Sequence, residues 1–269
     1  MAGLWEIGSY IQHRISSKSW RSFHSPFLFS LFRYILDDRI SIPTFEKVEE
    51  KRKDFLNSKQ KIQVNDFGAG SKVNPLHISR AIGDIARSSL SLPLQCRIMS
   101  RLATAVLAKN IVELGTSLGL SAAYLASAQS DSTVFTIEGD TEVANIADQL
   151  FQELELKNVV LINSTFERLF SSGTLPFNSI DLVFIDGNHR KDALVDYYQQ
   201  LAPYFHADTI AVIDDIYWSK DMQAGWRELI NMQAVTQSVD CYQFGILIFK
   251  KDFLQKQHHK VRLPLKSLF

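Results

Sequence analysis

The sequence predicts an α/β protein with a doubly wound, mostly parallel, seven-stranded sheet that follows an N-terminal helical extension. From residue 110 onward, short apolar runs alternate with helix-like segments. Each run is nearly continuous in Val, Ile, Leu and Phe, which is typical of parallel strands covered on both faces. Two further runs near the end are separated by three residues, too few for a helical crossover, and therefore predict an antiparallel hairpin.

The expected elements follow in chain order. The extension covers residues 1–95, with Pro26 and Pro43 at predicted helix starts or breaks and a Gly-rich turn at 66–71. The α/β domain covers residues 96–251, and a basic tail covers 252–269. The expected strands are 111–114, 133–138, 158–163, 180–186 and 209–215, and the hairpin strands are 234–240 and 244–251.

The charge balance restricts the class of partner. The chain of 269 residues has 29 Lys and Arg against 29 Asp and Glu, so its total charge favours neither nucleic acid nor an anionic membrane. We therefore expect a small-molecule partner. Cys96 and Cys241 match no metal-binding spacing and favour a reducing, cytoplasmic location. The first 20 residues interrupt their apolar positions with polar ones and predict an amphipathic helix.

Two glycine-containing stretches compete for the nucleotide site. A nucleoside site on such a sheet needs a strand, a tight turn, a helix and a later acidic residue for the ribose. The stretch "NIVELGTSLGLSAAYLA" (110–126) supplies the first three, and Glu138 ends the next strand 23 residues after Gly115. Ser117 stands where a pyrophosphate site needs its second glycine, so we expect a nucleoside ligand without a diphosphate, such as S-adenosylmethionine.

The other stretch, "VNDFGAGSKV" (64–73), lacks the helix that should follow the turn, because Pro75 prevents an immediate helix. We interpret it as a structural turn. The alternative is that Asp66, Ser71 and Lys72 fold over the pocket of the second substrate and help to select it.

Residues 96–250 resemble the class I S-adenosylmethionine-dependent methyltransferases, within them the catechol and caffeoyl-CoA O-methyltransferase-like branch. The motifs that carry the resemblance are "VELGTSLGLSAAYLA", "VFTIEGD", "LINSTFERL", "IDLVFIDGNHR" and "IAVIDDIYWS". The resemblance implies the strand order 3-2-1-4-5-7-6 and makes residues 96–251 the catalytic domain.

The resemblance also implies the cofactor contacts. Glu113 and the turn would contact the methionine part, Glu138 the ribose hydroxyls, and Ser164 and Thr165 the adenine. Alternatives remain, since Glu113 could cap a helix and the Ser/Thr pair could be a helix N-cap. The expected cofactor-binding residues are Glu113, Gly115, Thr116, Ser117, Gly119, Glu138, Ser164, Thr165 and Asp186.

Acidic residues end the fourth and fifth expected strands: Asp186, and then Asp214 and Asp215. The carboxyl ends of neighbouring strands share one crevice, so we expect these carboxylates to converge. In the related branch these positions, two Asp and one Asn, hold Mg²⁺ or Ca²⁺, and Asp215 replaces the Asn. Metal binding by Asp186, Asp214 and Asp215 is compatible with this pattern, and the alternative is hydrogen bonding that orders the strand ends.

His189 is the candidate base for deprotonating an acceptor hydroxyl, with Lys191 as its substitute and Asp186 also at the catalytic centre. Alternatively, His189 contacts solvent or substrate. Tyr217, Trp218 and Trp226 could line a pocket for a planar acceptor, although helix packing explains Trp226 equally well.

These residues together predict an S-adenosylmethionine-dependent enzyme that O-methylates a small molecule, with a divalent cation as an optional aid. The alternatives are a metal-independent N- or C-methyltransferase and a non-catalytic S-adenosylmethionine-binding protein. A homodimer is compatible with the sequence.

Overall fold

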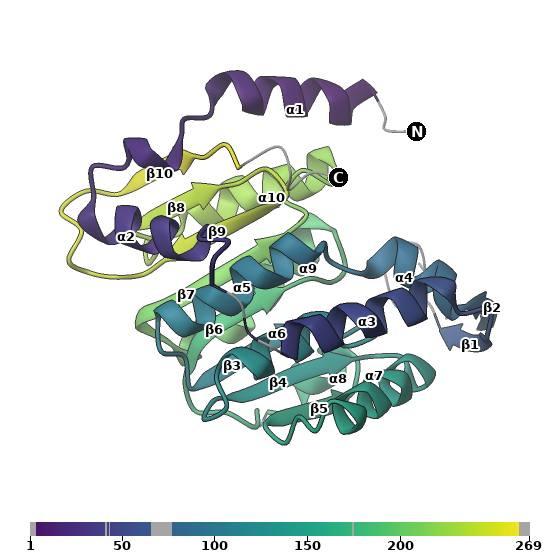
Figure 1. Ribbon diagram of the computed structural model, residues 1–269. Helices are drawn as coiled ribbons and strands as arrows, with labels where there is room; N and C mark the ends of the chain where they lie inside the picture. The colour runs from purple at the N-terminus through teal and green to yellow at the C-terminus, as the bar shows by residue number, and fades with distance from the viewer. Residues whose placement is uncertain (1–3, 41, 43, 66–76, 174, 264–269) are drawn as a thin grey trace. The chain divides into compact units, whose positions relative to one another are not determined.

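The computed structural model describes residues 4–40, 42, 44–65, 77–173 and 175–263 (Figure 1). The predicted Gly-rich turn at 66–71, with Asp66, Ser71 and Lys72, lies outside the described residues. The chain divides into two compact units. We call Tyr34–Asn178 the central unit, and Met1–Arg33 together with Ser179–Phe269 the terminal unit.

In the central unit, strands and helices alternate along the chain after an initial helical part. Parallel strands lie in the order β5, β4, β3, with Leu114 opposite Ile137 and Ile137 opposite Ile162. The elements are α3 (Thr44–Asn57), β1 (Lys61–Asn65), β2 (His77–Ala81), α4 (Ile82–Ser89), α5 (Pro93–Ala105), β3 (Asn110–Leu114), α6 (Leu120–Ala128), β4 (Thr133–Glu138), α7 (Thr141–Glu153), β5 (Val159–Asn163) and α8 (Phe166–Ser171).

Strands β1 and β2 form a separate antiparallel pair that the sequence reading did not anticipate. In β1, Ile62 and Val64 are buried while Lys61 and Gln63 are exposed, which is the alternation of a half-buried strand. The two buried side chains join a cluster with Leu118, Val143 and Ile146. The hairpin therefore packs beside the turn that follows β3 and against α7.

In the terminal unit, β6 (Ile180–Ile185) and β7 (Phe205–Asp214) are parallel, β9 (Phe244–Ile248) is antiparallel to β7, and β8 (Gln237–Asp240) is antiparallel to β9. The predicted terminal hairpin is thus confirmed. The other elements are α1 (Leu4–Ser16), the short 3-10 helix η1 (Trp20–Ser22), α2 (Pro26–Ile35), which continues into the central unit, α9 (Lys191–Leu201), the 3-10 helix η2 (Ala202–Tyr204), α10 (Lys220–Asn231) and β10 (Gln257–Lys260).

Strand β10 lies within residues 252–269, the expected basic tail. It pairs in parallel with β8, so that His258 lies opposite Ser238. Its sequence, "QHHK", has no β-branched or large apolar residue and carries no strand signal. Pairing with an existing sheet edge, rather than local propensity, makes this segment a strand.

The predicted α/β fold with a mostly parallel sheet and flanking helices is confirmed. Within each unit the order of the strands agrees with the expected one, in which β3, β4 and β5 are strands 1, 2 and 3 and β6, β7, β8 and β9 are strands 4, 5, 6 and 7. Among the helices that the structure describes, none is long and apolar enough to cross a lipid bilayer.

Candidate active site

The turn after β3 has the backbone of a ligand-binding loop. Gly115 and Gly119 have φ angles of 103° and 85°, and Ser117 has a φ of 47°. A side chain at Gly119 would also meet the ring of Phe151 at 2.9 Å and Ala147 at 3.1 Å. Glycine is thus required at position 119 by both backbone and packing. Helix α6 begins directly afterwards without a side-chain cap at Gly119, which suits a polar ligand at its N-terminus.

Glu138 lies at the carboxyl end of β4 and faces this turn. Its Oε2 accepts a hydrogen bond from the Ser117 N–H at 2.9 Å, and its Oε1 accepts one from the Asp140 N–H at 2.9 Å. Burial raises the pKa of Glu138, and these backbone donors oppose that rise. The half-buried carboxylate is therefore held in one orientation beside the turn, where we predicted the ribose-binding acid.

Glu113 is completely buried on β3. Its Oε2 accepts a hydrogen bond from the Thr136 hydroxyl at 2.6 Å, and the Thr136 hydroxyl lies 2.6 Å from that of Thr116. Its Oε1 has no partner in hydrogen-bond geometry among the described residues. Burial raises the pKa of Glu113 to about 7. A cationic group next to this carboxylate, such as an amino group, would compensate the buried charge.

The Ser/Thr pair after β5 has local partners. The Thr165 hydroxyl accepts a hydrogen bond from the Arg168 N–H and caps α8, while the Ser164 hydroxyl donates to the Thr165 carbonyl at 3.1 Å. The alternative reading as a helix N-cap is observed for Thr165. Contacts of Ser164 and Thr165 with an adenine ring stay a prediction.

The expected acids of the terminal unit follow β6 and end β7. Asp186 is half-buried, Asp214 is 7% exposed, and Asp215 has a left-handed φ of 52°. Burial raises the pKa of Asp215. Within the described part of the chain, no group of three or more His, Cys, Asp or Glu side chains is placed to hold a metal ion. The three carboxylates therefore do not fit a ready metal centre, and their metal-binding role stays a prediction.

His189, the predicted base, lies beside Asp215. Its Nε2 is 3.8 Å from Asp215 Oδ2, and its ring centroid is 5.5 Å from that of Trp218. Both His189 and Trp218 are accessible, and Trp218 is 58% exposed. An accessible imidazole next to a carboxylate is a suitable arrangement for a general base, because the carboxylate stabilises the imidazolium that forms.

Lys191 is placed differently from the expected substitute base. Its Nζ forms an ion pair with Glu228 Oε2 of α10 at 3.0 Å, and its main-chain N–H donates to Asp221. The hydrogen bond with Glu228 raises the pKa of Lys191, which disfavours the neutral amine that a base requires. The structure thus favours His189 over Lys191.

The aromatic residues after β7 separate into two groups. Trp226 is 3% exposed and lies over Gly245 of β9, where an added Cβ would meet its ring at 2.5 Å. Tyr217 is also buried, and its hydroxyl donates to Asp240. These two residues pack within the terminal unit. Trp218, beside His189, is the one of the three predicted aromatics that is exposed and free to line an acceptor pocket.

Three further residues lie at the candidate site, and none of them was predicted from the sequence. Ser89 Oγ lies 2.7 Å from Ser117 Oγ at the glycine turn. Asp140 supplies one of the amides that hold Glu138. Asn188, before His189, has a left-handed φ of 47° and a buried Oδ1 without a partner among the described residues. Only Asp140 had a signal in the sequence, as an acid just before a predicted helix.

Comparison with known proteins decides the class of this domain. Residues 112–216 match the family described as methyltransferase domain. This match supports the predicted methyltransferase class for this part of the chain. The match spans the glycine turn, Glu138, and the segment that contains Asp186, His189, Asp214 and Asp215. No curated protein sequence shows significant similarity to the chain.

Solved structures support the fold of the methyltransferase over most of its length. An O-methyltransferase from Bacillus cereus, in complex with SAH, is 18% identical, with a TM-score of 0.57 over 81% of this chain and 97% of the other. The O-methyltransferase TomG from Streptomyces achromogenes, in complex with SAM, is 18% identical, with a TM-score of 0.55 over 78% and 91%. The SAH-bound methyltransferase PaMTH1 from Podospora anserina is 16% identical, with a TM-score of 0.57 over 87% and 100%. The predicted resemblance to methyltransferases of this fold is thereby confirmed.

Proposed function

We propose that this methyltransferase transfers the methyl group of S-adenosylmethionine to an oxygen atom of a small molecule in the cytoplasm. The observation that carries the proposal is the Glu138 carboxylate, which backbone N–H groups of Ser117 and Asp140 hold beside the glycine turn. Such a carboxylate can accept hydrogen bonds from both ribose hydroxyls of a nucleoside. The turn has Ser117 in place of a pyrophosphate-binding glycine, which favours a nucleoside without a diphosphate.

The cofactor supplies an electrophilic methyl group when it is bound. The buried carboxylate of Glu113 is suited to the amino group of the methionine part. The sulfonium group would supply this methyl group to the acceptor oxygen, and the sulfur would retain the electrons of its broken bond to carbon. His189 takes the proton from the acceptor hydroxyl, and Asp215 stabilises the resulting imidazolium.

Binding of the cofactor is tested with Glu138→Ala and Glu138→Gln. Both variants should bind S-adenosylhomocysteine about 10- to 100-fold more weakly in calorimetric titration, because a lost hydrogen-bonding partner of a charged group costs about 1.5 to 3 kcal/mol. Wild-type protein should be stabilised thermally by S-adenosylhomocysteine and not by NAD. Stabilisation by NAD alone would overturn the cofactor assignment, and unchanged affinity in both variants would remove Glu138 from the site.

The proton transfer is tested with His189→Gln and Asp215→Asn, assayed for methyl transfer to a panel of small hydroxylated acceptors. We expect His189→Gln to lower kcat about 100-fold or more, a usual effect of removing a general base, with little change in cofactor affinity. Asp215→Asn should lower kcat less, because the imidazole remains. Lys191→Gln is the matched control and should retain activity. Activity that survives in His189→Gln and fails in Lys191→Gln would reverse the assignment.

The methyl transfer has two candidate routes, one assisted by Mg²⁺ or Ca²⁺ and one free of metal. The supporting feature is the sequence pattern of Asp186, Asp214 and Asp215, whereas the metal-free route relies on His189. Titrating either ion into wild type and Asp214→Ala distinguishes the routes. A response in wild type that the variant lacks would support a cation, and identical responses would support metal-independent transfer. Cofactor binding without turnover of any acceptor would favour a non-catalytic binding protein.

A further inference from the structure

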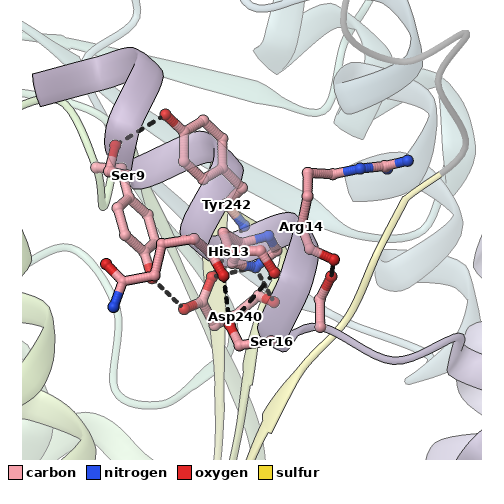
Figure 2. Close-up of polar contacts among 9 residues, drawn as sticks. Ser9, His13, Arg14, Ser16, Asp240 and Tyr242 are labelled. Atoms are coloured by element: carbon pink, nitrogen blue, oxygen red, sulfur yellow. Dashed lines mark hydrogen bonds and ion pairs between the residues drawn. The ribbon is translucent and has the colours of Figure 1, made fainter. Parts of the chain in front are cut away.

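Helix α1 is attached to the sheet of the terminal unit through a polar face. His13 is 2% exposed, and its Nε2 lies 3.0 Å from Asp240 Oδ1 at the end of β8. The other carboxylate oxygen of Asp240 accepts a hydrogen bond from the Tyr217 hydroxyl at 2.8 Å. Ser9 Oγ, one turn earlier on α1, lies 3.2 Å from the Tyr242 hydroxyl. Figure 2 shows Ser9, His13, Asp240 and Tyr242 between α1 and the strands.

The outward face of α1 is apolar. Ile7, Ile11 and Ile15 are 49%, 52% and 81% exposed. Their spacing of four residues places them on one side of the helix, which we call the isoleucine face. In an ordinary surface helix the apolar side faces the core and the polar side faces water. Helix α1 has the opposite arrangement, because it buries Ser9 and His13 and exposes isoleucine.

Basic residues follow the isoleucine face along the chain. After Glu6, residues 7–33 contain Arg14, Lys18, Arg21 and Arg33 but no Asp or Glu, and after Asp252, residues 253–263 contain Lys256, Lys260 and Arg262 but again no Asp or Glu. The total charge of zero, which argued against a membrane partner, therefore conceals a basic region in the terminal unit.

The structure joins these two segments. The Lys18 N–H donates to the Lys260 carbonyl at 2.9 Å, and the Arg262 N–H donates to the Lys18 carbonyl at 2.9 Å. Lys18, Lys260 and Arg262 are exposed. Arg21, also exposed, lies with its guanidinium 4.7 Å from the ring centroid of Trp20. The C-terminal end of α1 thus continues into a surface of exposed cations with an aromatic ring among them.

We propose that the isoleucine face, with this basic surface, docks on an anionic lipid bilayer. An exposed apolar helix face beside Lys, Arg and Trp is the composition of helices that lie in the membrane interface. A second copy of the chain is a poorer occupant, because it would bring Arg14, Lys18 and Arg21 against the same cations. The buried link between His13 and Asp240 holds α1 on the protein, so its apolar face is presented without detachment of the helix.

The test is co-sedimentation of the full chain with phosphatidylcholine vesicles that either contain or lack phosphatidylglycerol. We expect binding to the anionic vesicles alone, and weaker binding at higher ionic strength. The triple variant Ile7→Ser, Ile11→Ser, Ile15→Ser should bind the anionic vesicles at least about tenfold more weakly than wild type, because it removes the exposed apolar area. Lys18→Glu with Arg21→Glu should weaken binding through charge.

Leu107→Ser is the matched control, since Leu107 is 71% exposed but lies in the central unit. It should bind vesicles as wild type does. Because the substituted isoleucines are exposed, thermal unfolding and S-adenosylhomocysteine binding should be unchanged in the triple variant. Equal binding to neutral vesicles, or unchanged binding by the triple variant, would overturn the proposal. So would a dimer in light scattering that the triple variant abolishes, with no vesicle binding by wild type.

Discussion

Several residues at the strand ends adopt backbone conformations that are costly for their side chains. Ser117, Asn188 and Asp215 have φ angles of 47°, 47° and 52°, and each follows the carboxyl end of a strand. A non-glycine residue in the left-handed region costs roughly 1–3 kcal/mol and persists where the surrounding structure imposes it, often at a functional site. Ser117 belongs to the proposed cofactor turn, Asp215 is the partner of the proposed base, and Asn188 directly precedes that base.

The buried carboxylate of Glu113 should make stability depend on pH. Its pKa is raised from 4.5 to about 7 because burial disfavours the charged form. The folded protein therefore binds a proton that the unfolded chain has released, and the free energy of unfolding should fall as pH rises from about 4.5 through about 7. Glu113→Gln should remove this component, up to about 3 kcal/mol at pH 8.

Urea unfolding of wild type and Glu113→Gln at several pH values between 4.5 and 8 measures this component as the difference between the two proteins. As pH rises, the free energy of unfolding of Glu113→Gln should increase relative to that of wild type. A difference that does not change with pH would show that burial does not raise the pKa of Glu113 in the folded protein.

At the scale of elements, Asp140 connects three parts of the central unit. Its Oδ1 caps α7 by accepting the Val143 N–H at 2.9 Å, and its Oδ2 accepts the Asn65 N–H at the end of β1. Its own N–H donates to Glu138. The hairpin of β1 and β2 is thus connected through one buried residue, by its side chain and its main-chain N–H, to the acid that we assign to the ribose.

Variants at Asp140 separate these roles. Asp140→Ser can still cap α7 but is too short to reach Asn65, whereas Asp140→Ala loses both contacts. We expect both variants to bind S-adenosylhomocysteine about tenfold more weakly, because a tenfold change corresponds to about the free energy of one hydrogen bond to a charged group. Only Asp140→Ala should lose about 1 kcal/mol more stability, the usual value of an N-cap. Wild-type affinity in Asp140→Ser would show that the link to Asn65 does not position Glu138.

At the scale of the whole molecule, residues from both ends of the chain form one unit. Ser9 and Tyr242 are 233 positions apart in the sequence, yet their hydroxyl groups lie 3.2 Å apart. Strand β10 extends the sheet edge at β8, and Lys18 forms an isolated parallel bridge with Val261 beside it. Figure 1 shows α1 and β10 at the same end of the terminal unit.

The pair of His13 and Asp240 is the main polar link of α1 to this unit. His13→Ala should lower the free energy of unfolding by about 3–5 kcal/mol, because it leaves a buried carboxylate with fewer partners. The double variant with Asp240→Asn should recover part of that loss in denaturant unfolding. Ser16→Ala, at an exposed position on the same helix, is the control and should change little. Additive losses in the double variant would show that the two side chains are not coupled.

The sequence by itself determined the α/β class, the choice of residues 110–126 as the glycine turn, and Glu138 as the acid that faces it, whereas the strand order was implied by the resemblance to methyltransferases. These features depend on hydrophobic periodicity and on the spacing of residues close in the chain, which a sequence displays directly. Only the tertiary structure decided that Lys191 pairs with Glu228, that Trp226 packs on Gly245, and that β10 is a strand. It also showed that α1 buries its polar face and exposes its isoleucines. Each of these depends on a partner distant in sequence, and local composition does not specify that partner.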